Sequence, residues 1–421
     1  MAIDPGRPRC GEGPFGRSII ELGARIGTAL RWFAGLIPRR SVETLALLGV
    51  TALALGGSVE GYSRIESYSR PVAAGVFEIR GFSYPSYHNG TYASAESTAA
   101  LAELAKTGAN FVAIIPTRWS RTFKDSEFFA TDQTESDAGV LKAIADAHAL
   151  GLSVLLKPHV DPSDGKPRAE YAPTDVDAWF SNYTTFLLHY AAMAAANHVE
   201  MFDIGCELDS MVGPRYRDRW LRIIRSVREV YHGPIIYAHG WPGVNEVSFL
   251  DAVDYIGVDA YDPLSDAREP TVPELRAGWT TISSNPWVAS VSHFHSPMQN
   301  YRALWQRFHK PIIFTELGYK SVAGAAGRPG DWKWDGAVDL QVQERAYQAF
   351  FEVWSRQTAW VKGAFLWNWD PVVHPERSVN ELKDYTPQNK PAALVITRWY
   401  RRMAASEGRS SLAEAPPSAS R

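Results

Sequence analysis

The sequence predicts an α/β protein whose main body is a (β/α)8 barrel. From Val72 onward, apolar runs with the length of strands alternate with longer segments of helical character. Long connections follow several of these runs, as they do at one rim of such a barrel. Two of the runs, 204–208 and 312–319, carry one glutamate each near their end. A carboxylate is costly to bury without a partner, so both glutamates are expected at the open mouth of the barrel.

The expected elements form regular pairs along the chain. Strands are expected at 78–84, 110–116, 152–160, 199–205, 234–239, 255–261, 311–316 and 363–369. Helices are expected at 95–108, 137–151, 175–196, 214–231, 244–252, 298–309, 340–356 and 391–402. A proline opens the fourth helix, where its missing N–H is tolerated. A doubly wound sheet is the competing arrangement, but no Gly-rich turn follows the first strand.

The long connections all follow strands, and they are rich in tryptophan. In a barrel they would crowd one rim and wall a cleft. The connections span 117–136, 159–174, 263–297 and 318–339. Tryptophans at or beyond the strand ends are Trp119, Trp241, Trp279, Trp287, Trp332, Trp334, Trp367 and Trp369. Because flat aromatic faces stack on pyranose rings, this composition favours a carbohydrate-binding cleft.

The overall composition is that of an ordinary globular protein. The chain has 421 residues, of which 45% are hydrophobic and 21% charged, with a formal net charge of −3. No basic stripe marks the main body, so nucleic-acid binding has little electrostatic support. Only two cysteines occur, Cys10 and Cys206. The first lies in the N-terminal leader and the second beside a candidate catalytic residue, so no structural disulfide is expected between them.

The sequence divides into three regions: a leader at 1–71, the barrel at 72–405 and a disordered tail at 406–421. Within the leader, the apolar run 45–57 lies in the uncharged stretch 44–59. That length fits a signal peptide and is short for a spanning helix, so a cleaved signal and a membrane anchor both stay open. Arginines precede the run, which places the leader in the cytoplasm and the barrel outside it. We therefore expect an exported protein, periplasmic or extracellular, either free or anchored in the inner membrane.

The body from about residue 77 to 402 resembles the clan A glycoside hydrolases and is similar to glycoside hydrolase family 113, the β-mannanase-like group. The matching segments are Leu156-Lys157-Pro158-His159-Val160-Asp161, Gly205-Cys206-Glu207-Leu208, Asp259-Ala260-Tyr261, Phe314-Thr315-Glu316-Leu317-Gly318-Tyr319 and Leu366-Trp367-Asn368-Trp369. Clan A enzymes are retaining, with the acid/base at the end of strand four and the nucleophile at the end of strand seven. The resemblance therefore implies Glu207 as acid/base and Glu316 as nucleophile.

The same chemistry can be argued from the residues. Retaining hydrolysis needs two carboxylates roughly 5 to 5.5 Å apart, and strands four and seven face each other across an eight-stranded barrel. Glu207 should have a raised pKa, whereas Glu316 must stay ionised, held by a hydrogen bond from Tyr261. One position departs from the clan pattern, because Cys206 stands where many clan A enzymes have the asparagine that binds the sugar 2-hydroxyl. Either another residue binds that hydroxyl, or the substrate preference differs.

Other candidate site residues follow from their positions at strand ends. The candidate substrate-binding residues are Lys157, His159, Asp161, Trp241, Asp259, Tyr261, Trp367 and Trp369. The candidate supporting residues are Arg80, Cys206 and His239, with Arg80 placed on strand one to buttress a carboxylate from below. The reaction needs no cofactor, and no metal ligand is assigned.

The sequence thus predicts a retaining β-glycoside hydrolase that acts on a β-linked polysaccharide or oligosaccharide, with mannan as the first choice. A second hypothesis is a non-catalytic barrel that binds polysaccharide and supports its assembly or export at the membrane. A third is a metal-dependent barrel hydrolase. Such enzymes usually place a His-x-His motif on strand one, and residues 80–84 contain none.

Overall fold

The computed structural model describes residues 75–372 and 381–413. All described residues belong to one compact unit of the chain. The expected leader, with its apolar run 45–57, therefore lies outside the described residues, as do residues 414–421 of the expected tail. Among the helices of the described part, none combines the length and apolar character that crossing a membrane requires.

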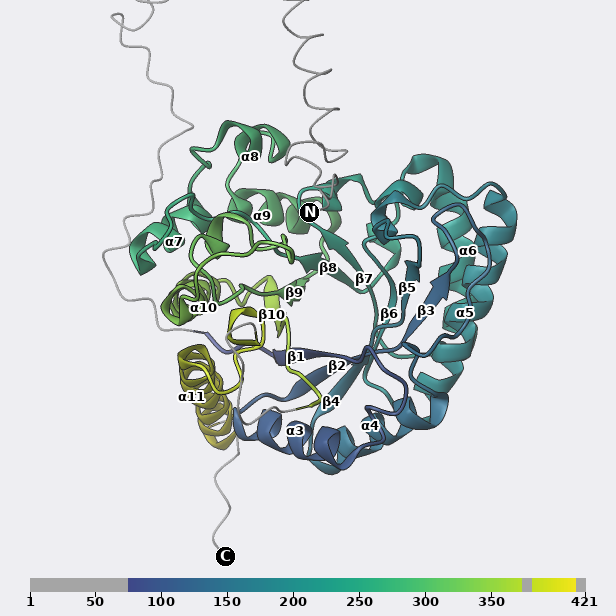
Figure 1. Ribbon diagram of the computed structural model, residues 1–421, viewed down its shortest axis with the longest axis horizontal. Coiled ribbons are helices and arrows are strands. Elements are labelled where there is room, and N and C mark those ends of the chain that lie inside the picture. The colour runs from purple at the N-terminus through teal and green to yellow at the C-terminus, as the bar shows by residue number, and fades with distance from the viewer. Residues whose placement is uncertain (1–74, 373–380, 414–421) are drawn as a thin grey trace, which may run out of the picture. The chain divides into compact units, whose positions relative to one another are not determined.

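Eight parallel strands of the described chain close into a barrel, which confirms the predicted fold class (Figure 1). The strands of the barrel are β1 (Ile79–Pro85), β2 (Phe111–Ile115), β4 (Ser153–Leu156), β6 (Met201–Cys206), β7 (Ile235–Gly240), β8 (Tyr255–Asp259), β9 (Ile312–Leu317) and β10 (Val361–Leu366). Each pairs with the next along the chain, and β10 pairs with β1 to close the ring. Because all strands run the same way, their carboxyl ends meet at one rim.

Helices surround the strands and bury their apolar sides against them (Figure 1). The α-helices are α3 (Ala95–Lys106), α4 (Asp137–Ala149), α5 (Val176–Ala196), α6 (Arg217–Val230), α7 (Val272–Thr280), α8 (Pro286–Val291), α9 (Pro297–Phe308), α10 (Leu340–Trp354) and α11 (Pro391–Ala413). Ser94, Ser136 and Asp175 each cap a helix by accepting the backbone N–H three residues on. Thr271 and Ser296 each form a full capping box.

The third expected strand, 152–160, is in fact two strands. β4 ends at Leu156, and β5 (His159–Pro162) pairs with β3 (Thr117–Ser120) in a separate two-stranded sheet above the barrel wall. Pro158 lies between them and has no N–H to donate, so the barrel ladder is interrupted there. This small sheet, which lies beside α5 in Figure 1, forms part of the rim above the barrel.

Three further segments differ from expectation. The helix expected at 244–252 is two 3₁₀ turns, η4 (Gly243–Glu246) and η5 (Leu250–Ala252), because Phe249 between them stacks on the ring of Trp220. The connection 263–297 contains α7 and α8. The last helix does not stop at residue 402, since α11 continues to Ala413. The other 3₁₀ turns are η1 (Arg168–Glu170), η2 (Asp209–Met211), η3 (Pro214–Tyr216), η6 (Ala325–Gly327) and η7 (Glu381–Lys383).

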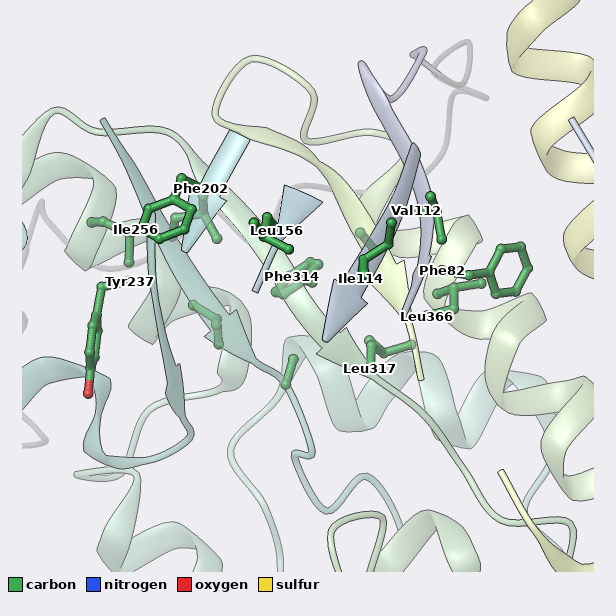
Figure 2. Packing of buried hydrophobic residues seen from close by; sticks show 14 of the residues in the cluster. Phe82, Val112, Ile114, Leu156, Phe202, Tyr237, Ile256, Phe314, Leu317 and Leu366 are labelled. Atoms are coloured by element: carbon green, nitrogen blue, oxygen red, sulfur yellow. The ribbon is translucent and has the colours of Figure 1, made fainter. Parts of the chain in front are cut away.

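Two of the apolar clusters in the described chain involve the strands of the barrel. The larger one fills the space between strands and helices, where the outward side chains of the strands pack, as Figure 2 shows for Phe82, Phe202, Phe314 and others. The smaller one closes the interior at the amino-terminal ends of the strands, and it consists of Ile79, Ala113, Leu155, Met201, Ile236, Ile313 and Phe365. A Cβ on Gly81 would lie 2.5 Å from the ring of Phe365, so glycine makes room for that ring. The interior is therefore a packed plug, and the open end lies at the carboxyl rim.

Candidate active site

A cleft of about 930 Å³ opens at the carboxyl ends of the strands. The β3–β5 sheet and the connections after β1, β5, β7, β9 and β10 line it, whereas the connection 263–297, which was expected to help wall it, contributes no lining residue. Of the candidate residues, those that line the cleft are His159, Asp161, Glu207, Trp241, Asp259, Tyr261, Glu316 and Trp367. The strand ends thus bring together residues that lie far apart in the sequence.

Glu316 lies on β9 and is only 6% exposed. Its neighbour on β8 in the strand register is Asp259. The two carboxylate oxygens have different donors: Lys157 donates to Oε1 at 2.6 Å and Tyr261 donates to Oε2 at 2.9 Å. The hydrogen bond from Tyr261 confirms the contact that the sequence predicts. Both donors stabilise the ionised form of this carboxylate.

Lys157 is fully buried beneath the cleft and does not line it. Its ammonium lies 2.6 Å from Glu316 and 3.5 Å from Asp259. Burial alone would lower the pKa of Lys157, but the two carboxylates outweigh it and hold that pKa above its usual range. The lysine is therefore a buried cation bonded to protein carboxylates. The expectation that it contacts substrate is wrong, because a sugar cannot reach it.

Glu207 follows β6 and is half-buried at the cleft wall. Its backbone is in the left-handed region, with φ of 51°, and its N–H donates to the carbonyl of Ala238 at 3.1 Å. A non-glycine residue rarely adopts this conformation, which turns the side chain from the strand direction toward the cleft. Gly240 makes space for the carboxylate, because a Cβ there would lie 3.2 Å from Oε1 of Glu207.

Both glutamates come close to Cys206. Its Sγ is 3.9 Å from Oε1 of Glu316 and within 4.8 Å of a carboxylate oxygen of Glu207. Burial, followed by the charges of Asp259 and Glu316, raises the pKa of Glu207 to about 8. Burial also raises the pKa of Glu316, but the charge of Lys157 acts in the opposite direction and is the largest influence that lowers it. Glu207 is therefore protonated at neutral pH, whereas Glu316 has the ammonium of Lys157 as a counter-charge in direct contact.

Cys206 is 3% exposed and its thiol points at Asp259, with Sγ 3.4 Å from Oδ2. Burial raises the pKa of this thiol, so the sulfur keeps its proton near neutrality. The neutral thiol is a weak donor and is already directed at a carboxylate. The position of the clan A asparagine is thus filled by a side chain that supports Asp259.

The β3–β5 sheet presents His159 in a fixed orientation. Arg168 binds both oxygens of Asp161, at 2.8 and 2.9 Å, and also lies 2.6 Å from Nδ1 of His159. Burial, then the charges of Arg168 and Lys157, lowers the pKa of His159, so the ring is neutral. A guanidinium can only donate, which leaves the ring proton on Nε2. Among the described residues, neither this Nε2 nor Nε1 of Trp119 has a hydrogen-bond partner, although both side chains line the cleft.

Aromatic side chains frame the cleft. Trp241 meets the ring of Trp287 edge to face, with the ring centroids 6.3 Å apart, and Trp332, which also lines the cleft, is 68% exposed. Trp367 lines the cleft as expected. Trp369, however, is 5% exposed, packs edge to face on Phe82 and donates to the carbonyl of Ala100. The expectation that Trp369 binds substrate is wrong, because alternation along the chain turns it toward the helices.

Two candidate supporting residues lie elsewhere. Arg80 is at the amino-terminal end of the barrel, where it donates to the carbonyls of Phe77 and Gly108 and pairs with Glu407 at 2.8 Å. It therefore supports α11 rather than a catalytic carboxylate. His239 is 1% exposed beside the cleft, with Nε2 3.5 Å from Asp209, so it does not face the two glutamates directly.

Sequence reasoning missed three residues of the site. Arg168 lies in the long connection after β5, and the acidic Asp161 seven positions earlier was the available signal for a guanidinium partner. Asp203 is fully buried in the barrel interior, and burial raises its pKa to about 8. It looked like an ordinary strand residue because a buried carboxyl has no local sequence signature. Tyr87 lines the cleft just after β1, where the sequence shows only a polar turn.

Two groups of side chains come close enough to hold a metal ion. They are His159 with Cys206 and Glu316, and Cys206 with Glu207 and Asp259, each with potential ligand atoms within 4.8 Å of one another. Glu316 in the first group and Asp259 in the second already face the ammonium of Lys157. The positive charge that a cation would supply at Glu316 is supplied by the lysine.

Comparisons with known proteins identify relatives. The family model described as Glycoside Hydrolase Family 113 matches residues 81–390. A solved structure described as a complex of a GH113 β-1,4-mannanase is 28% identical, with a TM-score of 0.65 over 77% of this chain and 99% of that one. The GH113 β-mannanase AaManA from Alicyclobacillus acidocaldarius, in complex with ManMIm, is 29% identical, with a TM-score of 0.66 over 78% of this chain and 98% of that one. No curated protein matches the chain.

Proposed function

The chain belongs to glycoside hydrolase family 113 and is a glycosidase, and from this membership and the geometry of its cleft we propose that it is a retaining β-mannanase. The observation that carries the proposal is the pair Glu207 and Glu316, which both lie close to Cys206 in one cleft, with the ammonium of Lys157 bonded to Glu316. The substrate is a β-linked polysaccharide or oligosaccharide, and the likeness to β-1,4-mannanases favours β-mannan.

In the proposed first step, Glu316 is the nucleophile. One of its carboxylate oxygens attacks the anomeric carbon while the bond to the leaving-group oxygen breaks. Glu207 gives its proton to that oxygen, for which a pKa of about 8 suits it at neutral pH. In the second step Glu207, now ionised, takes a proton from water, and the water oxygen displaces Glu316 from the anomeric carbon. The configuration at that carbon is retained because it is inverted twice.

The β3–β5 sheet supplies donors for substrate hydroxyls in this proposal. Nε2–H of His159 and Nε1–H of Trp119 are buried N–H groups that line the cleft and, within the described chain, have no partner. Leaving such donors unpaired is costly, so a sugar hydroxyl that accepts from them would be favoured. These donors can take over hydroxyl binding from the asparagine that Cys206 replaces. Trp241, Trp332 and Trp367 offer aromatic faces for further sugar rings.

The test is hydrolysis of soluble β-mannan by the purified protein, with the anomeric configuration of the first products followed by NMR. We expect initial products with the β configuration. We also expect Glu316→Gln to reduce the hydrolytic activity by a factor of about 10⁴ or more. A 2-deoxy-2-fluoro mannosyl fluoride should label Glu316. Initial α products would contradict the retaining mechanism. Binding of mannan without hydrolysis would favour the non-catalytic alternative.

We also propose that the protein acts outside the cytoplasm, carried there by residues 44–59 as a cleaved signal or an inner-membrane anchor. The support is the uncharged apolar stretch after a series of arginines. Fractionation of expressing cells, with N-terminal sequencing of the product, tests this. An intact protein in the soluble cytoplasmic fraction would contradict it.

A further inference from the structure

The interior of the barrel changes from apolar to charged just below the cleft. The apolar plug ends at the level of Leu155 on β4. Two residues further along, the side chain of Lys157 rises into a layer that contains Asp203, Asp259 and Thr315, all with no exposed surface. Among the described residues, Lys157 is the one cation within 4 Å of Glu316. Lys157 is therefore the buried counter-charge in direct contact with the proposed nucleophile.

Asp259 and Glu316 compete for this lysine. They lie side by side on β8 and β9, and the ammonium is 2.6 Å from Oε1 of Glu316 and 3.5 Å from Oδ1 of Asp259. Asp259 is itself fixed, because Thr315 donates to Oδ1 at 2.7 Å and the thiol of Cys206 faces Oδ2. Two like charges at adjacent buried positions repel each other strongly, and one lysine between them offsets both.

We propose that Lys157 is a positioning residue that keeps Glu316 ionised before attack, and that Asp259 remains as the partner of the lysine while Glu316 is held as a glycosyl ester. This inference rests on the proposed function. It assigns Lys157 a role that its sequence position, at the end of a barrel strand, does not reveal.

The changes in charge during the reaction explain why Lys157 needs Asp259 as a second partner. When the oxygen of Glu316 bonds to the anomeric carbon, Glu316 loses its negative charge, and Glu207 gains one by giving its proton to the leaving group. In the second step the carbon–oxygen bond to Glu316 breaks, its electron pair returns to the carboxylate, and the proton of water goes to Glu207. Without Asp259, the buried ammonium would have no partner between these steps, which is a costly state. With Asp259 fixed 3.5 Å away, the lysine stays paired throughout.

Several charged or titratable groups face Glu316 and contribute to its pKa. Lys157 comes from the end of β4 and Arg168 from η1. His159 on β5, Cys206 on β6 and Glu207 after it, and Asp259 on β8 and Tyr261 after it also lie close to this carboxylate. Burial raises the pKa of Glu316, Lys157 is the largest influence that lowers it, and Asp259 raises it. Changes at Lys157 and Asp259 should therefore move this pKa in opposite directions.

The experiment measures kcat/KM on soluble β-mannan against pH for Lys157→Met and Asp259→Asn. The acid limb of the profile reports ionisation of the nucleophile. In Lys157→Met we expect the midpoint of the acid limb to move up by at least about one pH unit. We also expect kcat to fall about 100-fold, with a much smaller change in KM. In Asp259→Asn the lysine serves Glu316 alone, so we expect the acid limb to move down. If Lys157→Met does not fold, the shift in Asp259→Asn still decides.

Lys390 offers a matched control. Its side chain is also fully buried and also paired, with Nζ 2.7 Å from Asp384 and 3.0 Å from the hydroxyl of Ser321. Lys390→Met should lower stability and leave the midpoint of the acid limb unchanged. An acid limb that stays in place in both test variants would overturn the inference.

The inference and the proposed function can fail separately. If Glu316→Gln stays active and the fluoro sugar labels another residue, the proposed function is wrong. If the wild-type protein is labelled at Glu316 but neither Lys157→Met nor Asp259→Asn moves the acid limb, only the role of Lys157 is wrong.

Discussion

The hydroxyl of Tyr261 donates to Oε2 of Glu316 at 2.9 Å, on the side of the carboxylate opposite to Lys157. The two oxygens of the proposed nucleophile are thus held by one donor from the cleft wall and one from the barrel interior. Tyr261 has this position because β8 ends at Asp259, and the chain then turns over the end of β9. The orientation of Glu316 is fixed before any substrate binds.

Tyr261→Phe should reduce kcat/KM by about 10- to 100-fold, since a hydrogen bond to a charged group contributes roughly 1.5–3 kcal/mol. The acid limb of the pH profile should also move to higher pH, because the ionised form of Glu316 loses a donor. Tyr385→Phe is a suitable control, since the hydroxyl of Tyr385 donates to the carbonyl of Pro329 although its ring lies against Tyr261. An unchanged acid limb in Tyr261→Phe would contradict the assigned contact.

The basic limb of the wild-type profile should report Glu207. Its pKa is raised to about 8, so the acid form is present below that pH and is lost as pH rises through it. We expect kcat/KM on β-mannan to fall above about pH 8, approaching a tenfold loss per pH unit. Glu207→Gln should abolish this limb and should retain more activity on aryl mannosides with good leaving groups, which need no proton. A basic limb that persists in Glu207→Gln would assign the proton to another group.

Gly240→Ala should displace the acid/base. The added Cβ would lie 3.2 Å from Oε1 of Glu207, in the direction of the carboxylate. Since proton transfer needs a donor within hydrogen-bond reach, we expect kcat to fall about 10- to 100-fold, with little change in thermal stability. Gly213→Ala is the control, because a Cβ there would have no neighbour within 4 Å. Full activity of Gly240→Ala would show that Glu207 has room to move.

The fold could be predicted because its signals are local. Alternating strand-like and helical runs indicate a barrel, and side-chain caps such as Ser94 and Ser136 mark where helices begin. What the sequence could not show depends on tertiary contacts. Pro158 interrupts one apolar run and redirects it into the β3–β5 sheet, and the stacking of Phe249 on Trp220 replaces a regular helix with turns.

In the candidate site, too, some residues could be predicted from local sequence signals and others depend on tertiary contacts. The glutamates are visible in the sequence because an acidic residue at the end of an apolar run is unusual. The difference between Trp367, which lines the cleft, and Trp369, which faces the helices, depends on how the chain leaves β10. Likewise Lys157 and His159 both lie at strand ends, but only the structure shows that one is sealed beneath the cleft and the other faces it.

This difference between tryptophans is testable. Trp369→Ala should lower the free energy of unfolding by about 3–5 kcal/mol, since it removes a buried ring from the helix–strand interface. Trp332→Ala should change the free energy of unfolding by less than about 0.5 kcal/mol, because the ring is 68% exposed, but should raise KM for β-mannan about tenfold. Denaturant unfolding and steady-state kinetics measure the two effects. A large loss of stability in Trp332→Ala together with a raised KM in Trp369→Ala would contradict these assignments.

Asp203→Asn should change the dependence of stability on pH. Asp203 is fully buried and its pKa is raised to about 8, so between its unfolded pKa and pH 8 the folded state holds a proton that the unfolded state has lost. The stability contribution of this group is therefore present at low pH and is lost as pH rises toward 8, by up to about 1.4 kcal/mol per pH unit. Asparagine cannot ionise and can still accept the N–H of Gly205.

Denaturant unfolding at several pH values tests this dependence. The free energy of unfolding should decline less steeply with pH in Asp203→Asn than in the wild-type protein. Asp218→Asn, at an exposed helix start, is the control and should leave the decline unchanged. Parallel declines in Asp203→Asn and wild type would mean that Asp203 is ionised in the folded barrel, beside the single charge of Lys157.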